Sequence, residues 1–111
     1  MPDELEVRRL SIDPDRLLPG EQTDTTLSAD ADHWVGVYTA LLGTKRQLIA
    51  NLRELMEPQS EDVKAELERA DVRMLEMQIE RFEKRLAFWQ NKGRELDRIE
   101  LPSSPRRAPI A

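Results

Sequence analysis

The positions of the prolines constrain the fold of this chain more than any other feature. All seven lie near the ends or at one central point, at positions 2, 14, 19, 58, 102, 105 and 109. Proline removes a backbone donor and clashes with the preceding helical turn, so it is rare inside helices. The two long proline-free stretches, 20–57 and 59–101, are therefore where long helices can form.

Apolar residues recur at helical spacing in both of these stretches. In the first stretch, flanking apolar positions widen the main set into a stripe broader than a strict coiled-coil seam. Asp30 or Asp32 can cap the first amides of this helix, and Ser60 can cap the next one. We predict helices over about 31–57 and about 60–98. The main set of the first helix repeats every seven residues: Trp34, Leu41, Leu48 and Leu55.

A short connection joins the two predicted helices. Pro58 disfavours a helical conformation at Glu57, so the chain is expected to turn within residues 57–60. A connection this short makes the helices antiparallel neighbours. The sequence thus predicts an all-α fold with three parts: a flexible acidic segment (1–30), an antiparallel two-helix hairpin (31–101) and a disordered Pro/Arg tail (102–111).

The second predicted helix changes its apolar face partway along. On a helical wheel its two apolar stripes lie about 100° apart. A hairpin buries one face only, so we expect a second copy to cover the earlier stripe and complete a homodimeric four-helix bundle. The earlier stripe consists of Val63, Leu67, Ala70, Met74 and Met77, and the later one of Val72, Leu75, Ile79, Phe82, Leu86, Trp89 and Leu96.

The open end of the hairpin is the second expected interaction surface. Folding about the turn places Trp34 and Tyr38 opposite Phe82. The second helix is expected to overhang the first by about 10 Å. The N-terminal segment, a second copy or a different partner would then have to cover the residues at or beyond the end of the first helix, which are Leu86, Phe88, Trp89 and Leu96.

Small residues share the face of the first helix opposite its main stripe. They are Gly36, Ala40, Gly43 and Ala50. Small side chains permit close approach of a partner helix, but in water the same face can equally be unused surface. Both interpretations stay open on the sequence alone.

Composition and charge exclude several classes of protein. The chain has no cysteine, so disulfides and thiolate metal sites are excluded. No apolar run reaches the roughly 20 residues of a membrane span, and the acidic start lacks the apolar core of a secretion signal. We expect a cytoplasmic protein that binds neither membrane nor nucleic acid, because the −5 net charge leaves no broad basic stripe.

No pattern of residues indicates catalysis or a cofactor. His33, the only histidine, lies beside Asp30 and Asp32, but three neighbours at a helix start do not converge as metal ligands do. Trp34-Val35-Gly36 resembles the motif of the WXG helical-hairpin family, where it lies in the turn. Here it lies inside the first predicted helix, so no family is assigned. We expect no enzyme, no metal and no cofactor.

The sequence favours a non-enzymatic helical module for protein–protein interaction, acting as an adaptor or regulator and pairing as a homodimer. One alternative is a bundle that binds a small ligand or lipid in an aromatic pocket at the open end. Another is an acidic decoy, in which residues 1–32, with nine acidic and three basic side chains, imitate nucleic acid.

Overall fold

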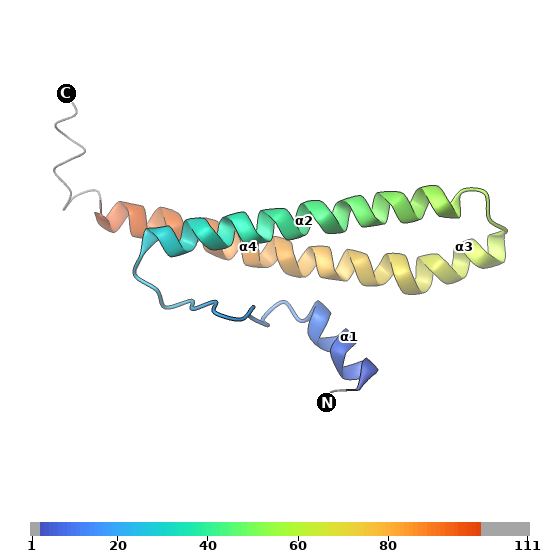
Figure 1. Ribbon diagram of the computed structural model, residues 1–111, viewed down its shortest axis with the longest axis horizontal. Helices are drawn as coiled ribbons and strands as arrows, with labels where there is room; N and C mark the ends of the chain where they lie inside the picture. Colours follow the sequence, from blue (N-terminus) through green and yellow to red (C-terminus); the bar gives the residue numbers. More distant parts are fainter. Residues whose placement is uncertain (1–2, 101–111) are drawn as a thin grey trace, which may run out of the picture.

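All the secondary structure of the described residues is helical, which confirms the all-α prediction. A computed structural model describes residues 3–100, and the predicted tail at 102–111 lies outside them. The helices are α1 (Glu4–Ile12), α2 (Ser28–Met56), α3 (Glu61–Leu67), a π-helical turn η1 (Glu68–Val72) and α4 (Arg73–Glu100). Elements α3, η1 and α4 follow one another as one long helix (Figure 1).

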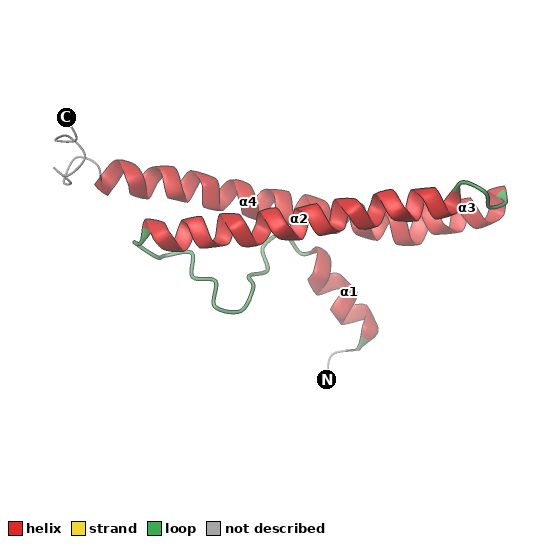
Figure 2. Ribbon diagram, turned by 45° about the horizontal axis from the view of Figure 1, so that its top comes forward, coloured by secondary structure: helices red, strands yellow, loops and turns green. Residues whose placement is uncertain are grey.

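The molecule is a thin rod of 65 × 36 × 15 Å. Helix α2 packs mainly against α4, and the two lie side by side in opposite directions (Figures 1 and 2). The turn at 57–60 forms one end of the rod. The start of α2 and the end of α4 form the other, which we call the open end.

Helix α2 begins earlier than the sequence analysis predicted. Leu27, not an aspartate, occupies the N-cap position, and no side chain caps the helix there. Asp30 lies in the first turn, where a negative charge is favoured by the helix dipole, and its carboxylate accepts a hydrogen bond from the Thr25 hydroxyl. Asp30 therefore stabilises the first turn from within it.

This earlier start shortens the overhang of the second helix. A Cβ atom built at Gly93 would lie 3.5 Å from the Ala31 Cβ atom, so the first turns of α2 already face α4 at Gly93. The predicted N-cap of the second helix is confirmed: the Ser60 side chain accepts a hydrogen bond from the Val63 amide at 3.4 Å. Helix α4 continues through Gly93 to Glu100, two residues beyond the predicted end.

The π-helical turn η1 accounts for the change of apolar face along the second helix. At its end the Arg73 amide donates to the Glu68 carbonyl, five residues back. Such a turn contains one residue more than an α-helical turn, and one residue corresponds to about 100° on the wheel. This rotation equals the predicted offset between the stripes, so Val63 and Leu67 come into line with the later stripe that starts at the fully buried Val72.

The N-terminal residues lie against α4. Helix α1 contacts α4, and the non-helical residues 13–27, which we call the strap, run from α1 along α4 to the start of α2 (Figures 1 and 2). Leu18 of the strap packs against the main core. That core lies in the open-end half of the rod and consists of Ala31, Tyr38, Leu42, Phe82 and Trp89.

Candidate functional site

One carboxylate of the strap is the focus of the most connected polar site in the described residues. The Glu21 side chain is completely buried. It accepts hydrogen bonds from the Tyr38 hydroxyl at 2.6 Å, Arg85 Nη2 at 2.7 Å and Trp89 Nε1 at 2.7 Å. The Leu18 amide adds a fourth bond at 2.8 Å from within the strap. Two helices and the strap thus meet at this carboxylate.

Charge and hydrogen bonding keep Glu21 ionised despite its burial. Burial alone would raise its pKa, but the bonds from Tyr38, Arg85, the Leu18 amide and Trp89 together lower it below the ordinary value. For Tyr38, burial and the bond to Glu21 raise the pKa to about 12. Burial would lower the pKa of Arg85, yet its bonds to Glu21 and Tyr38 raise it.

A second buried arginine holds the backbone of the N-terminal residues. Arg81 is 4% exposed. Its Nη1 donates to the Ser11 carbonyl at 3.0 Å and its Nη2 to the Arg16 carbonyl at 3.5 Å. Burial lowers the pKa of Arg81, as does the charge of Arg16. No described residue accepts a bond from Nε of Arg81 or Arg85, so both guanidinium groups keep one unused donor.

The predicted aromatic cluster at the open end forms inside the chain. The Trp34 and Trp89 rings stack with centroids 6.3 Å apart, and the Tyr38 and Phe82 centroids lie 5.9 Å apart. The Phe88 ring meets Trp89 edge-on at 5.1 Å. Because these rings pack against one another, they fill the core instead of enclosing an empty pocket.

The structure places the predicted interface residues in three environments. Four are buried in the monomer, six are half-buried and three are exposed on α2. The buried ones are Tyr38, Phe82, Trp89 and Leu96; the half-buried ones are Trp34, Leu67, Met74, Met77, Leu86 and Phe88; the exposed ones are Gly36, Ala40 and Gly43. A Cβ atom at Gly36 or Gly43 would meet no atom of the described residues within 4 Å.

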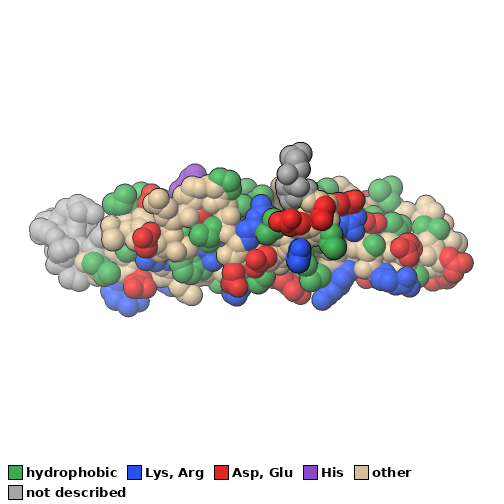
Figure 3. Space-filling model, turned by 90° about the horizontal axis from the view of Figure 1, so that it is seen from below, with side chains coloured by type: hydrophobic (Ala, Val, Ile, Leu, Met, Phe, Trp, Pro, Cys, Tyr) green, Lys and Arg blue, Asp and Glu red, His purple; other side chains and the backbone are tan. Residues whose placement is uncertain are grey.

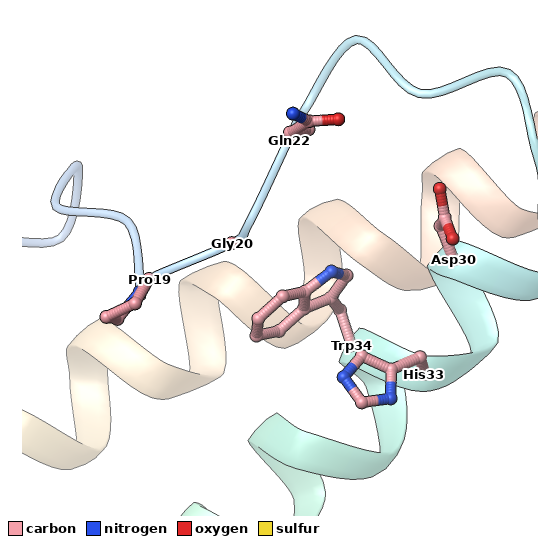
Figure 4. A pocket seen from close by; sticks show the side chains of 6 residues that line it. All are labelled: Pro19, Gly20, Gln22, Asp30, His33 and Trp34. Carbon is pink, nitrogen blue, oxygen red and sulfur yellow. The ribbon is translucent and has the colours of Figure 1, made fainter.

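A hollow of about 470 Å³ lies between the strap and α2 at the open end. Figure 4 shows the Trp34 ring extending from α2 toward the strap at Pro19 and Gly20, with His33 beside it. Gln22 and Asp30 complete the lining. Trp34 is the only one of the clustered core aromatics that lines this hollow, and most of its other lining groups are polar.

The turn-proximal half of the rod carries a more apolar groove. Its volume is about 480 Å³, and it lies between α2 and α4. Leu48 and Leu55, which line it, are 45% and 69% exposed. The full lining is Leu48, Asn51, Leu52, Leu55, Asp71, Met74, Leu75 and Gln78.

Met74 connects this groove with a further hollow beneath α1. That hollow, of about 380 Å³, is lined by Leu5, Arg8, Arg9, Ile12 and Met74. The two hollows share Met74, so apolar surface continues from the groove to α1.

Other kinds of site find no support in residues 3–100. Within this range, no cluster of histidine, aspartate and glutamate has the arrangement of metal ligands, and no helix combines the length and apolarity of a membrane span. Acidic and basic side chains are interspersed over the face in Figure 3. That face presents no broad stripe of one charge.

Comparison with protein-family models, curated proteins and solved structures finds no match.

Sequence reasoning did not identify Glu21, Arg81 and Arg85 as site residues. One signal was present: both arginines continue the stripe of Met74 and Met77 along the same face of the helix. Arginines in an apolar stripe indicate a face that packs against polar backbone or a carboxylate. Nothing in the sequence singles out Glu21 among the acidic residues of the first 32 positions.

Proposed function

We propose that this chain is a non-enzymatic protein–protein interaction module whose antiparallel hairpin pairs with a second copy into a four-helix bundle. The observation that carries the proposal is the unequal burial of the two halves of the rod. The open-end half holds the closed core, whereas Met56 and Val72 are the only described hydrophobic residues buried in the turn-proximal half.

The exposed leucines fit a second copy as the occupant of the turn-proximal groove. A two-helix hairpin this thin buries little apolar surface, and a small chain gains stability by pairing. A twofold dimer is the commonest way to cover one apolar patch with an identical one. Stacking two hairpins would bury Leu48 and Leu55 of both copies at once and complete a four-helix core.

The polar site supports a non-enzymatic role. General acid–base catalysis needs a titratable group that can reach a substrate. The Glu21 carboxylate already accepts four hydrogen bonds and is closed off from solvent. Tyr38 is equally buried, so this cluster holds the chain together and does not face a substrate.

The second predicted function, ligand binding in an aromatic pocket, has less support. Tyr38, Phe82 and Trp89 occupy the space that a ligand would need, and each is at most 5% exposed. The hollow beside Trp34 offers one aromatic face only. A helical module that pairs with itself is therefore the function that we favour.

The dimer is tested by light scattering after gel filtration, across a range of concentrations. We expect wild type to give twice the chain mass of 12.9 kDa and Leu55→Glu to give the single mass, because a carboxylate would be buried unpaired in the interface. Leu55 is 69% exposed in the monomer, so the substitution leaves the monomer fold unchanged.

Leu27→Glu is the matched control, since Leu27 is 59% exposed but lies at the open end. This variant is expected to stay dimeric. A wild-type mass of 12.9 kDa at every concentration, or a dimeric Leu55→Glu, would rule out pairing through the turn-proximal groove.

A further inference from the structure

We propose that the face of α4 that holds the strap is a recognition surface for acidic peptide segments of other proteins. In the free chain, Glu21 of the strap occupies its carboxylate position. This surface lies beneath the strap, away from the turn-proximal groove, and it goes beyond self-pairing because its ligand is a non-helical segment of a different protein.

The donors of this surface are fixed by the helical core and not by the strap. Trp89 is held by its stacking on Trp34, and the Arg85 guanidinium lies 4.8 Å from the centroid of the Phe88 ring. Tyr38 is held against Phe82. Donors that are oriented before a ligand arrives cost little ordering entropy on binding.

The segment that fills the surface is irregular by comparison. No residue of the strap is helical. Its own backbone hydrogen bonds are local turns, including Arg16 to Asp13 and Glu21 to Leu18. Gly20 has a positive φ of 84°, which favours glycine and turns the chain so that Glu21 points into the site. Recognition of an acidic motif by arginine donors is one of the recurring modes of peptide binding.

The contacts of the strap indicate which peptides would fit. Arg81 donates to backbone carbonyls only, that of Arg16 in the strap and that of Ser11 at the end of α1, so this contact does not depend on the side chains of the segment that it holds. Leu18 contributes the apolar anchor. Glu21 lies three positions later and contributes the carboxylate. The surface therefore fits an acidic segment that forms a turn like that of the strap, with an apolar residue three positions before a glutamate and a glycine directly before it.

The strap acts as a built-in competitor for such a peptide. A segment tethered beside its site has an effective concentration in about the millimolar range. A free peptide must overcome this concentration before it binds. Weakening the strap at Glu21 should therefore reveal binding that wild type hides.

The test uses the full chain and two fluorescent peptides. One peptide is residues 13–27 of this sequence, and the other is the same peptide with Glu21→Gln. We expect the Glu21→Ala chain to bind the first peptide about tenfold or more tightly than the second, since a hydrogen bond to a charged group contributes about 1.5–3 kcal/mol. Wild type is expected to bind neither peptide at micromolar concentration.

Two variants that each remove one positive charge test whether the discrimination between the peptides depends on the carboxylate site. Adding Arg85→Gln to the Glu21→Ala chain should remove the discrimination between the peptides. Adding Lys84→Gln should leave it, because Lys84 pairs with exposed Asp15 at 3.3 Å outside the carboxylate site. Circular dichroism checks that each chain is helical.

Three outcomes would overturn the proposal. The first is a helical Glu21→Ala chain that binds neither peptide, and the second is one that binds both equally. The third is loss of helical structure in Glu21→Ala and also in Glu21→Gln, which keeps the volume of the side chain. In that case the carboxylate is an inseparable part of the fold.

Discussion

At the scale of the residue, the bond between Tyr38 and Glu21 sets the chemistry of the core. The hydroxyl donates to a buried carboxylate, so ionising it would place two negative charges 2.6 Å apart. The neutral phenol is therefore strongly favoured in the folded chain.

The ionisation of Tyr38 can be followed without interference. It is the only tyrosine in the chain, so tyrosinate absorbance during a pH titration reports it alone. We expect a midpoint at about 12 instead of the ordinary value near 10. Because the folded chain disfavours the ionised form, the stability contributed by this group is complete below about pH 10 and is lost as the pH rises to about 12.

Glu21→Gln is the control for this titration. It removes the neighbouring negative charge, so the midpoint should move back toward 10. A wild-type midpoint near 10, with native circular dichroism at that pH, would show that Tyr38 is neither buried nor bonded to Glu21 in solution.

At the scale of the element, the π-helical turn η1 is a one-residue insertion that brings Val63 and Leu67, which precede it, onto the face of the later stripe. Deleting a residue inside it should convert it to an ordinary α-helical turn without changing the alignment of the stripes. The exposed Ala70 is the residue to remove. We expect the deletion of Ala70 to keep the helical content and to change the melting temperature by only a few degrees.

The matched control deletes Glu80, which is also exposed but lies in regular helix. That deletion rotates the residues after position 80 by about 100° relative to those before it, so Ile79 and Phe82 can no longer share a face. Cooperative thermal unfolding followed by circular dichroism should be lost. An equal loss of cooperative unfolding in the two deletion variants would contradict the role assigned to η1.

The sequence predicted the positions of the long helices better than their exact ends and the irregular turn within the second one. Proline positions and helical spacing predicted where the long helices lie, and Ser60 predicted one helix start correctly. The start of α2 was misplaced by three residues, because an aspartate such as Asp30 is as favourable inside the first turn as at the cap. The 100° offset between stripes was detected, but a wheel that assumes regular α-helix cannot distinguish a turned face from a π-helical turn.

The polar site was beyond prediction for a physical reason. Its members lie far apart in the chain, and one charged residue in an irregular segment resembles any other until its donors are in place. The aromatic residues of the site were identified from their spacing, since apolar periodicity extends over a whole helix. Glu21, the partner of Arg85, was not identified, because a single hydrogen-bond acceptor leaves no periodic signal.

At the scale of the whole molecule, the strap closes the core that the two long helices leave open. Helix α1 contains no buried residue, whereas the strap carries Glu21 and Leu18 into the core. The two N-terminal parts should therefore contribute very differently to stability.

Two truncations measure this difference in urea unfolding, followed by tryptophan fluorescence at one fixed protein concentration. Removing residues 1–10 should change the free energy of unfolding by less than about 1 kcal/mol. Removing residues 1–27 breaks the buried ion pair of Glu21 and Arg85 and uncovers the apolar core beneath Leu18, which should cost about 3–5 kcal/mol. Similar losses from both truncations would mean that α1, and not the strap, stabilises the rod.

The Glu21 contacts also have a consequence for how the chain is made. They join residues 64 and 68 positions apart in the sequence, and the acidic segment is synthesised first. During synthesis Glu21 remains in water until the ribosome has released both Arg85 and Trp89. Docking of the strap is therefore among the last steps of folding, and a chain that stops before Trp89 is left with an open core that a protease can recognise.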